Sequence, residues 1–301
     1  MRALVISGGG SKGAFGGGVA QYLMEELGYS YDLFIGTSTG SLLISHLALG
    51  KIQKIKEVYT SVTQNAIFSN CPFTIKTDKW GESQIGINHF SVLRNFLRGS
   101  KTFGESHHLR SLIQEVFTED EFETLKQSAK EVVVTVSNLS LNATEYKSIN
   151  HTTYEDFCDW IWISCNYVPF MSLVKKEGCE YADGGFGSMV PIKEAIDRGA
   201  TEIDVIVLET EITYYNSLPS KNVFSLLTNL HAFMIDRIEK QNIAIGKFAA
   251  SNKGVIINLY YTPTVLTTNS LIFDKKKMIQ WWEKGFQYAA GKNITLNEIR
   301  E

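Results

Sequence analysis

The pentapeptide GTSTG at residues 36–40 constrains the fold of this chain more than any other stretch. An apolar run precedes it, and residues 41–49, which are rich in leucine and lack glycine and proline, predict a helix after it. Gly-x-Ser-x-Gly between a strand and a helix is the spacing of a nucleophile elbow, the sharp turn that exposes one serine. Such a turn strains the serine backbone by roughly 1–3 kcal/mol, and Gly36 and Gly40 leave room for the adjoining strand and helix. The pattern predicts Ser38 as a nucleophile, although a connecting loop rich in small residues remains the alternative on this motif alone.

A second glycine-rich segment, residues 7–18, follows a predicted strand near the N-terminus and precedes a predicted helix at 19–27. Consecutive glycines between a strand and a helix leave backbone N–H groups bare, and two chemistries use such a loop. One is a phosphate cradle, because Gly8-x-Gly10-x-x-Gly13 matches the dinucleotide-binding fingerprint. The other is an oxyanion hole, in which N–H groups hold the negative oxygen of a tetrahedral intermediate.

The second predicted strand discriminates between these two chemistries. A dinucleotide site needs an acidic residue at the end of that strand to bind the ribose, whereas Asp32 stands at its start and Ser38 follows its end. A P-loop is excluded because Lys12 is followed by Gly13 and not by serine or threonine. If the two strands are parallel neighbours, both glycine loops face each other at their carboxyl ends.

A third motif, Asp183-Gly184-Gly185, follows a short predicted strand. Asp-Gly-Gly is common as ordinary turn chemistry. The functional interpretation is that the tight turn fixes the Asp183 carboxylate at the mouth of the sheet.

A serine hydroxyl needs a proton acceptor before it can attack an ester. Of the six histidines, only His231 follows Asp183 in the chain, and it lies within a predicted helix rather than on a loop after a strand. His107 and His108 lie in a polar stretch at a predicted helix start. The Ser, Asp, His order of the α/β-hydrolases is therefore disfavoured, and a carboxylate that acts directly on Ser38 is the better prediction.

The other predicted elements alternate between strands and helices, with no repeat, low-complexity tract or linker. Residues 65–100 are expected to be mainly polar loop with isolated aromatics, or less favourably a flap over the site. The remaining predicted strands are 3–6, 33–35, 130–136, 143–149, 203–208 and 255–261, and the remaining helices are 52–59, 106–117, 154–164, 191–198, 223–250 and 275–290.

Composition narrows the class of partner. The chain has 301 residues, 44% of them hydrophobic, and a net charge of −3, which disfavours nucleic acid as a partner. The four cysteines lack the spacing of a zinc site or a disulfide framework and indicate reduced residues of a cytoplasmic protein. We expect no signal peptide, because the first strand begins at once, and no apolar run long enough to span a bilayer. Contact with a membrane or micelle would then be peripheral.

The three motifs, in this order and each after a predicted strand, resemble the patatin-like phospholipase family. The resemblance covers residues 1 to about 200 and implies a three-layer α/β/α fold with a central, mostly parallel sheet. It also implies a hydrolase of lipid acyl esters that needs no metal or cofactor, with Ser38 as nucleophile and Asp183 as base. The implied oxyanion hole comprises Gly8, Gly9, Gly10, Ser11, Lys12 and Gly13, and Lys12 matches a position that is often basic in the family. Residues 165–171 replace a small, proline-rich stretch of the family, which affects the shape of the acyl pocket.

We therefore expect one α/β hydrolase domain over residues 1–301, with the motifs in a core of about 1–200 and C-terminal helices and a strand in 201–301. The expected reaction is hydrolysis of the carboxylic ester of a phospholipid or lysophospholipid. Two alternatives stay open: transfer of the acyl group to an alcohol, and binding of a lipid or nucleotide without turnover. The Asp183 motif favours the enzyme, since binding alone needs no carboxylate facing a serine.

Overall fold

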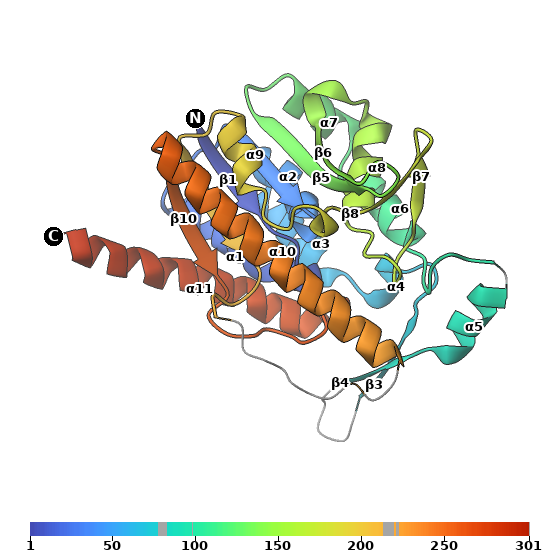
Figure 1. Cartoon of the computed structure of the whole chain (residues 1–301). Helices are drawn as coiled ribbons and strands as arrows, with labels where there is room; N and C mark the ends of the chain where they lie inside the picture. The colour runs from blue at the N-terminus through green and yellow to red at the C-terminus, as the bar shows by residue number, and fades with distance from the viewer. Residues whose placement is uncertain (78–82, 98, 213–219, 221–222, 301) are drawn as a thin grey trace.

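The computed structural model describes residues 1–77, 83–97, 99–212, 220 and 223–300. Within this part of the chain the main sheet has eight strands (Figure 1). Their order is β10-β9-β1-β2-β5-β8-β7, with β6 paired to β5. The strands from β10 to β5 run parallel, whereas β6, β7 and β8 are antiparallel to their partners. The bounds are β1 Arg2–Ile6, β2 Leu33–Thr37, β5 Glu131–Asn138, β6 Ala143–Ser148, β7 Val174–Lys176, β8 Cys179–Asp183, β9 Glu202–Val207 and β10 Ile256–Tyr261.

Helices cover both faces of this sheet, so the chain forms the predicted three-layer α/β/α fold (Figure 1). Side chains alternate along β1, with Val5 packed among residues of α9 and α10 and Leu4 packed among residues of α1, α2 and α11. Strands buried on both faces are the rule in parallel sheets. The helices are α1 Gly13–Gln21, α2 Thr39–Ala48, α3 Ile52–Ser61, α4 Gln64–Ile67, α5 His89–Leu97, α6 His107–Val116, α7 Glu119–Lys126, α8 Tyr154–Ser164, α9 Ile192–Asp197, α10 Val223–Lys253 and α11 Lys275–Arg300.

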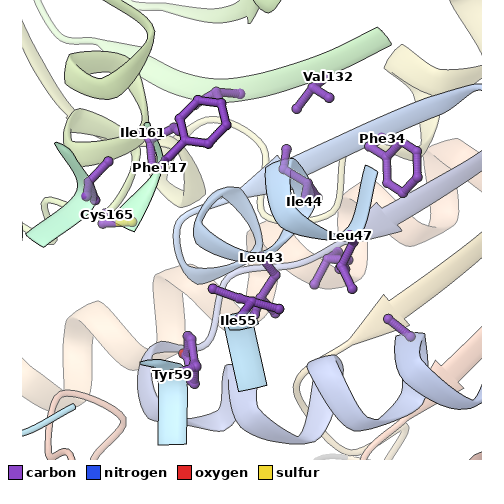
Figure 2. Close-up of a cluster of buried hydrophobic side chains, with 14 of the residues drawn as sticks. Phe34, Leu43, Ile44, Leu47, Ile55, Tyr59, Phe117, Val132, Ile161 and Cys165 are labelled. Carbon is purple, nitrogen blue, oxygen red and sulfur yellow. The ribbon is translucent and has the colours of Figure 1, made fainter. Parts of the chain in front are cut away.

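The larger core lies behind the serine motif. In Figure 2, Leu43 and Leu47 of α2 lie close to Ile55 of α3, and Phe34 of β2 lies on the other side of α2. Each of these side chains is at most 3% exposed. Burying a leucine, isoleucine or phenylalanine contributes about 1.5–3 kcal/mol, so this packing fixes the position of α2 behind β2.

The first helix begins six residues earlier than the predicted start at residue 19, inside the glycine run. The cause is a close contact between α1 and α11. A Cβ on Gly17 would collide with the Trp282 ring, and one on Gly18 would collide with the Trp282 carbonyl oxygen. Glycine is a poor helix former. It is needed here because the backbone of α1 lies directly against Trp282 of α11 and leaves no room for a side chain.

The prediction of loop over residues 65–100 was wrong for much of this stretch. It contains α4, the antiparallel hairpin of β3 (Phe73–Thr77) and β4 (Ser83–Ile87), and α5. Residues 78–82 and 98 lie outside the described residues. Two short elements were also missed, α7 and β7.

Among the described residues, no helix combines the length and apolarity that crossing a bilayer requires.

Candidate active site

Ser38 and Asp183 are brought together by two strands that meet end to end. Thr37, the last residue of β2, pairs with Thr135 of β5, and Asp183, the last residue of β8, pairs with Val136. The other edge of β5 is occupied by β6 over these positions. The strands β2 and β8 therefore share one edge of β5 and approach each other from opposite directions. Ser38 follows Thr37 directly, so it lies level with Asp183.

The backbone at Ser38 has the strain that the elbow pattern predicts. Its φ of 52° and ψ of −122° lie in a region that residues with a side chain rarely adopt. Ser38 is the N-cap of α2, so the positive end of that helix points at the serine. A Cβ on Gly36 would collide with the backbone of Gly40, and one on Gly40 would collide with the Ile6 carbonyl.

The Ser38 hydroxyl donates a hydrogen bond of 2.6 Å to Oδ2 of Asp183. The other carboxylate oxygen accepts 2.7 Å from the Gly185 N–H, and a Cβ on Gly184 would collide with the Thr135 carbonyl. Asp183 is only 2% exposed. Burial raises its pKa to about 7, although the hydrogen bonds from Ser38 and Gly185 act in the opposite direction. A carboxyl with a pKa near neutrality can both accept and return a proton at physiological pH.

Of the predicted oxyanion loop, Gly8, Gly9 and Gly10 line the same cavity as Ser38. A Cβ on Gly8 would lie 3.0 Å from Cβ of Ser38. Among the described residues, no hydrogen-bond acceptor is found for the N–H groups of Gly9 and Gly10. The Gly10 carbonyl is turned away and accepts hydrogen bonds from the hydroxyls of Thr39 (2.8 Å) and Tyr59 (2.6 Å).

The next residues of that loop are engaged elsewhere. The Ser11 N–H donates 2.8 Å to the Ser270 carbonyl, and the Lys12 N–H donates 3.2 Å to the Gly9 carbonyl. The Lys12 side chain, 5% exposed, forms an ion pair with Glu209. Gly13 begins α1, and a Cβ there would collide with Tyr59. The loop therefore offers Gly9 and Gly10, rather than Ser11 or Lys12, as free backbone donors.

Two residues at the site were not singled out from the sequence. The hydroxyl of Ser164, which is fully buried, accepts 2.8 Å from the Ser38 N–H. The Asn166 carbonyl accepts 2.9 Å from the Asp183 N–H. They hold the backbone of the serine and the aspartate from one short segment at the end of α8. For Asn166 the available signal was the unusual stretch at 165–171, which was related only to the acyl pocket, and Ser164 directly precedes this stretch.

The serine and the aspartate open into a cavity of about 870 Å³. Its walls include Cys165, Tyr167, Phe170 and Met171, so the unusual stretch does shape the cavity. A second, apolar pocket of about 60 Å³ adjoins it, and the two share Leu42, Ile67, Leu109 and Phe273. An apolar pocket thus lies next to the cavity that contains Ser38. Tyr59, Phe117 and Ile161, which line this pocket, are labelled in Figure 2.

The lining of the large cavity also includes the carboxyl groups of Glu209, Asp236 and Glu239. Glu209 is paired with Lys12, and Asp236 is paired with Lys240 at 3.0 Å. Glu239 is 5% exposed, and burial together with the nearby Glu209 raises its pKa to about 8. No group of three or more potential metal ligands occurs among the described residues.

His231 does not lie against the serine. Its ring contacts Tyr167, Phe170 and Phe186, with centroid distances of 5.9, 6.3 and 6.2 Å. Burial lowers its pKa. It is an aromatic contact of α10, and Asp183 occupies the place of a proton acceptor beside Ser38.

Comparison with known proteins gives three findings. The chain is 26% identical over 226 residues to the uncharacterized protein YjjU of Escherichia coli, a match that covers 71% of this chain and 53% of YjjU, so the chain spans about half of that relative's length. The structure of VipD from Legionella pneumophila aligns with 96% of this chain and 66% of VipD, at a TM-score of 0.49 and 13% identity. The model of the patatin-like phospholipase family matches residues 4–196, which contain all three motifs. The chain belongs to the patatin-like phospholipase family.

Proposed function

We propose that this chain hydrolyses the fatty-acyl ester of a phospholipid or lysophospholipid, with Ser38 as nucleophile and Asp183 as general base. The observation that carries the proposal is the 2.6 Å hydrogen bond between the two side chains inside a large, partly apolar cavity. Family membership supports lipid hydrolysis in general, and the geometry supports the roles of the individual residues.

In the first step the Ser38 oxygen attacks the ester carbonyl while its proton passes to Oδ2 of Asp183. The N–H groups of Gly9 and Gly10 are the donors available to the oxyanion, where each good donor is worth about 2.7–4 kcal/mol. The protonated Asp183 then gives the proton to the departing alcohol, which leaves an acyl group on Ser38. Asp183 next takes a proton from water, which attacks the acyl group. Asp183 then returns this proton to the Ser38 oxygen as the bond between Ser38 and the acyl carbon breaks and the fatty acid leaves.

The shape of the cavity supports a lipid substrate. An ester held at Ser38 could extend its acyl chain past Leu42, one helical turn further along α2, into the apolar pocket. The polar wall with Lys12 and Glu209 lies in the same cavity and is available to the head group.

We expect a fluorophosphonate probe to label this protein once, on Ser38, and to stop hydrolysis of a phospholipid or lysophospholipid in the same proportion. The probe mimics the ester carbonyl and loses fluoride when the serine oxygen attacks its phosphorus. Mass spectrometry of the labelled peptide locates the modification, and fatty-acid release measures activity. Labelling of another residue, or full labelling of Ser38 with no effect on hydrolysis, would contradict the assignment.

We also expect hydrolysis to depend on the ionisation of Asp183. Only the carboxylate can accept the serine proton, and burial raises its pKa to about 7. The value of kcat/KM should therefore fall about tenfold per pH unit below about pH 7 and level off above it. The measurement is a pH profile with a soluble ester whose own ionisation does not change. Full activity down to about pH 5 would show that Asp183 is not the titrating base.

A further inference from the structure

The first half of α10 presents an apolar stripe to solvent. Val223, Leu226, Leu230 and Phe233 are 79%, 58%, 52% and 63% exposed. Their spacing of three, four and three residues places them on one face of the helix. Figure 1 shows this half of α10 reaching past the sheet toward β3 and β4, whereas the second half crosses the face of the sheet.

The opposite face of the same helical segment borders the cavity and carries mainly small or polar side chains, together with Ile235. Ser225, Thr228, Asn229 and Ala232 line the cavity that contains Ser38. A helix of a globular protein normally turns its apolar face to the core and its polar face to water. In this segment the apolar stripe instead faces solvent while mainly small or polar side chains border the cavity, so the outer face suits an apolar environment.

A second exposed apolar face lies at the same cavity. Phe90, Leu93 and Leu97 of α5 are 78%, 57% and 76% exposed. Ile87 and His89, which precede and begin this helix, line the cavity together with the residues of α10. The two apolar faces therefore flank one opening, and we call Phe90, Leu93, Leu97, Val223, Leu226, Leu230 and Phe233 the rim surface.

The charge of the surrounding sequence indicates what the rim surface meets. The chain has 32 acidic residues and a net charge of −3, yet residues 83–104 and 212–235 contain no aspartate or glutamate. The first stretch carries the described basic residues Arg94 and Lys101. Arg94 is exposed on α5, between the apolar side chains. An exposed apolar face that carries an exposed arginine, in sequence stretches free of aspartate and glutamate, complements an anionic lipid surface.

We propose that the rim surface docks this protein onto an anionic lipid bilayer, with α5 and the first half of α10 lying in the interface. This proposal rests on the proposed lipid hydrolysis, because it explains how an ester leaves a bilayer for the cavity without crossing water. The rim side chains enter the boundary between head groups and acyl chains, and Arg94 meets lipid phosphates. The polar inner face of α10 then forms the cavity wall along which the polar part of the lipid moves.

Vesicle flotation tests the proposal, with Ser38→Ala in every sample so that the lipid stays intact. The probes are vesicles of phosphatidylcholine alone and vesicles that contain about 30% phosphatidylglycerol. We expect strong binding only to the anionic vesicles and at least a tenfold loss of binding in Leu226→Ser/Leu230→Ser/Phe233→Ser. Arg94→Glu should weaken binding severalfold, and added salt should reduce that difference.

Phe248→Ser is the matched control. Phe248 is 71% exposed on the same helix, about 22 Å further along its axis from Phe233, and should leave binding unchanged. Circular dichroism and a soluble short-chain ester, assayed with Ser38 intact, check that the triple variant is folded, because its changed side chains do not line the cavity.

The outcomes separate this proposal from the proposed function. Vesicle binding that is lost in the triple variant, by a protein that cleaves no ester, would overturn the function and leave the docking surface standing. Ester hydrolysis with equal vesicle binding by the triple variant and its parent would overturn the docking surface alone. Concentration-dependent dimers that the triple variant abolishes, without vesicle binding, would assign the rim surface to a second copy and overturn the proposal.

Discussion

Ser38→Ala is expected to reduce ester hydrolysis by roughly 10⁴-fold or more, to the background of the assay. The substitution removes the attacking oxygen, and among the described residues no other hydroxyl forms a hydrogen bond with Asp183. The fold should persist, because alanine adds no volume and only one hydrogen bond, worth about 1–2 kcal/mol, is lost.

The measurement is the initial rate on a soluble ester at equal concentrations of folded protein, with thermal unfolding followed in parallel. Ser61→Ala is the control, because Ser61 is exposed at the end of α3 and its hydroxyl bonds only to the backbone of that helix. Substantial turnover by folded Ser38→Ala would sink the assignment of the nucleophile.

Asp183→Asn is expected to be nearly as damaging, with a loss of about 10²–10⁴-fold, because the amide cannot accept the serine proton. The same variant should be more stable than the wild type at about pH 8. The folded-state pKa of Asp183, about 7, lies above its ordinary value of 3.8, so the folded protein holds the proton more tightly than the unfolded chain. Wild-type stability therefore falls as the pH rises from about 4 to about 7, by at most about 4 kcal/mol. Asparagine carries no charge and avoids this loss.

Unfolding temperatures of both proteins at about pH 5 and pH 8 test the stability part. The advantage of Asp183→Asn should be small at the lower pH and clear at the higher one, and an advantage that does not change with pH would contradict the buried-carboxylate account. His231→Gln serves as the catalytic control, because His231 packs among aromatic rings, and it should keep most of the activity. A His231→Gln protein as inactive as Ser38→Ala, beside an active Asp183→Asn, would replace the dyad with a histidine mechanism.

The fold class followed from local signals, since each strand of the parallel part is a short apolar run bounded by glycine or polar residues. The strained turn at Ser38 was also predictable, because Gly-x-Ser-x-Gly has few other uses between a strand and a helix. Two elements that the sequence analysis missed do have local sequence signals. Thr118 and Glu121 form a capping box at the start of α7, and residues 73–77 alternate in polarity, as is typical of a strand.

Other features depend on contacts between distant segments and have no local signal. Gly17 lies in α1 because it packs against Trp282 of a distant segment. From the sequence alone, a glycine that packs against a tryptophan cannot be distinguished from a glycine in a loop. The position of Asp183 beside Ser38 depends on the register with which β8 pairs with β5. The register of strand pairing depends on tertiary structure. The sequence therefore predicted that Ser38 and Asp183 act together, but it could not predict the distance between them.

The end-to-end meeting of β2 and β8 has a consequence during synthesis of the protein. Ser38 is made early, with strands β1 and β2, but its hydrogen-bond acceptor Asp183 lies 145 residues later in the chain. At a synthesis rate of about 5–20 residues per second, the nascent chain carries Ser38 without Asp183 for about 7–30 s. On the proposed mechanism, a ribosome-bound chain cannot attack nearby lipid until β8 has emerged and paired with β5.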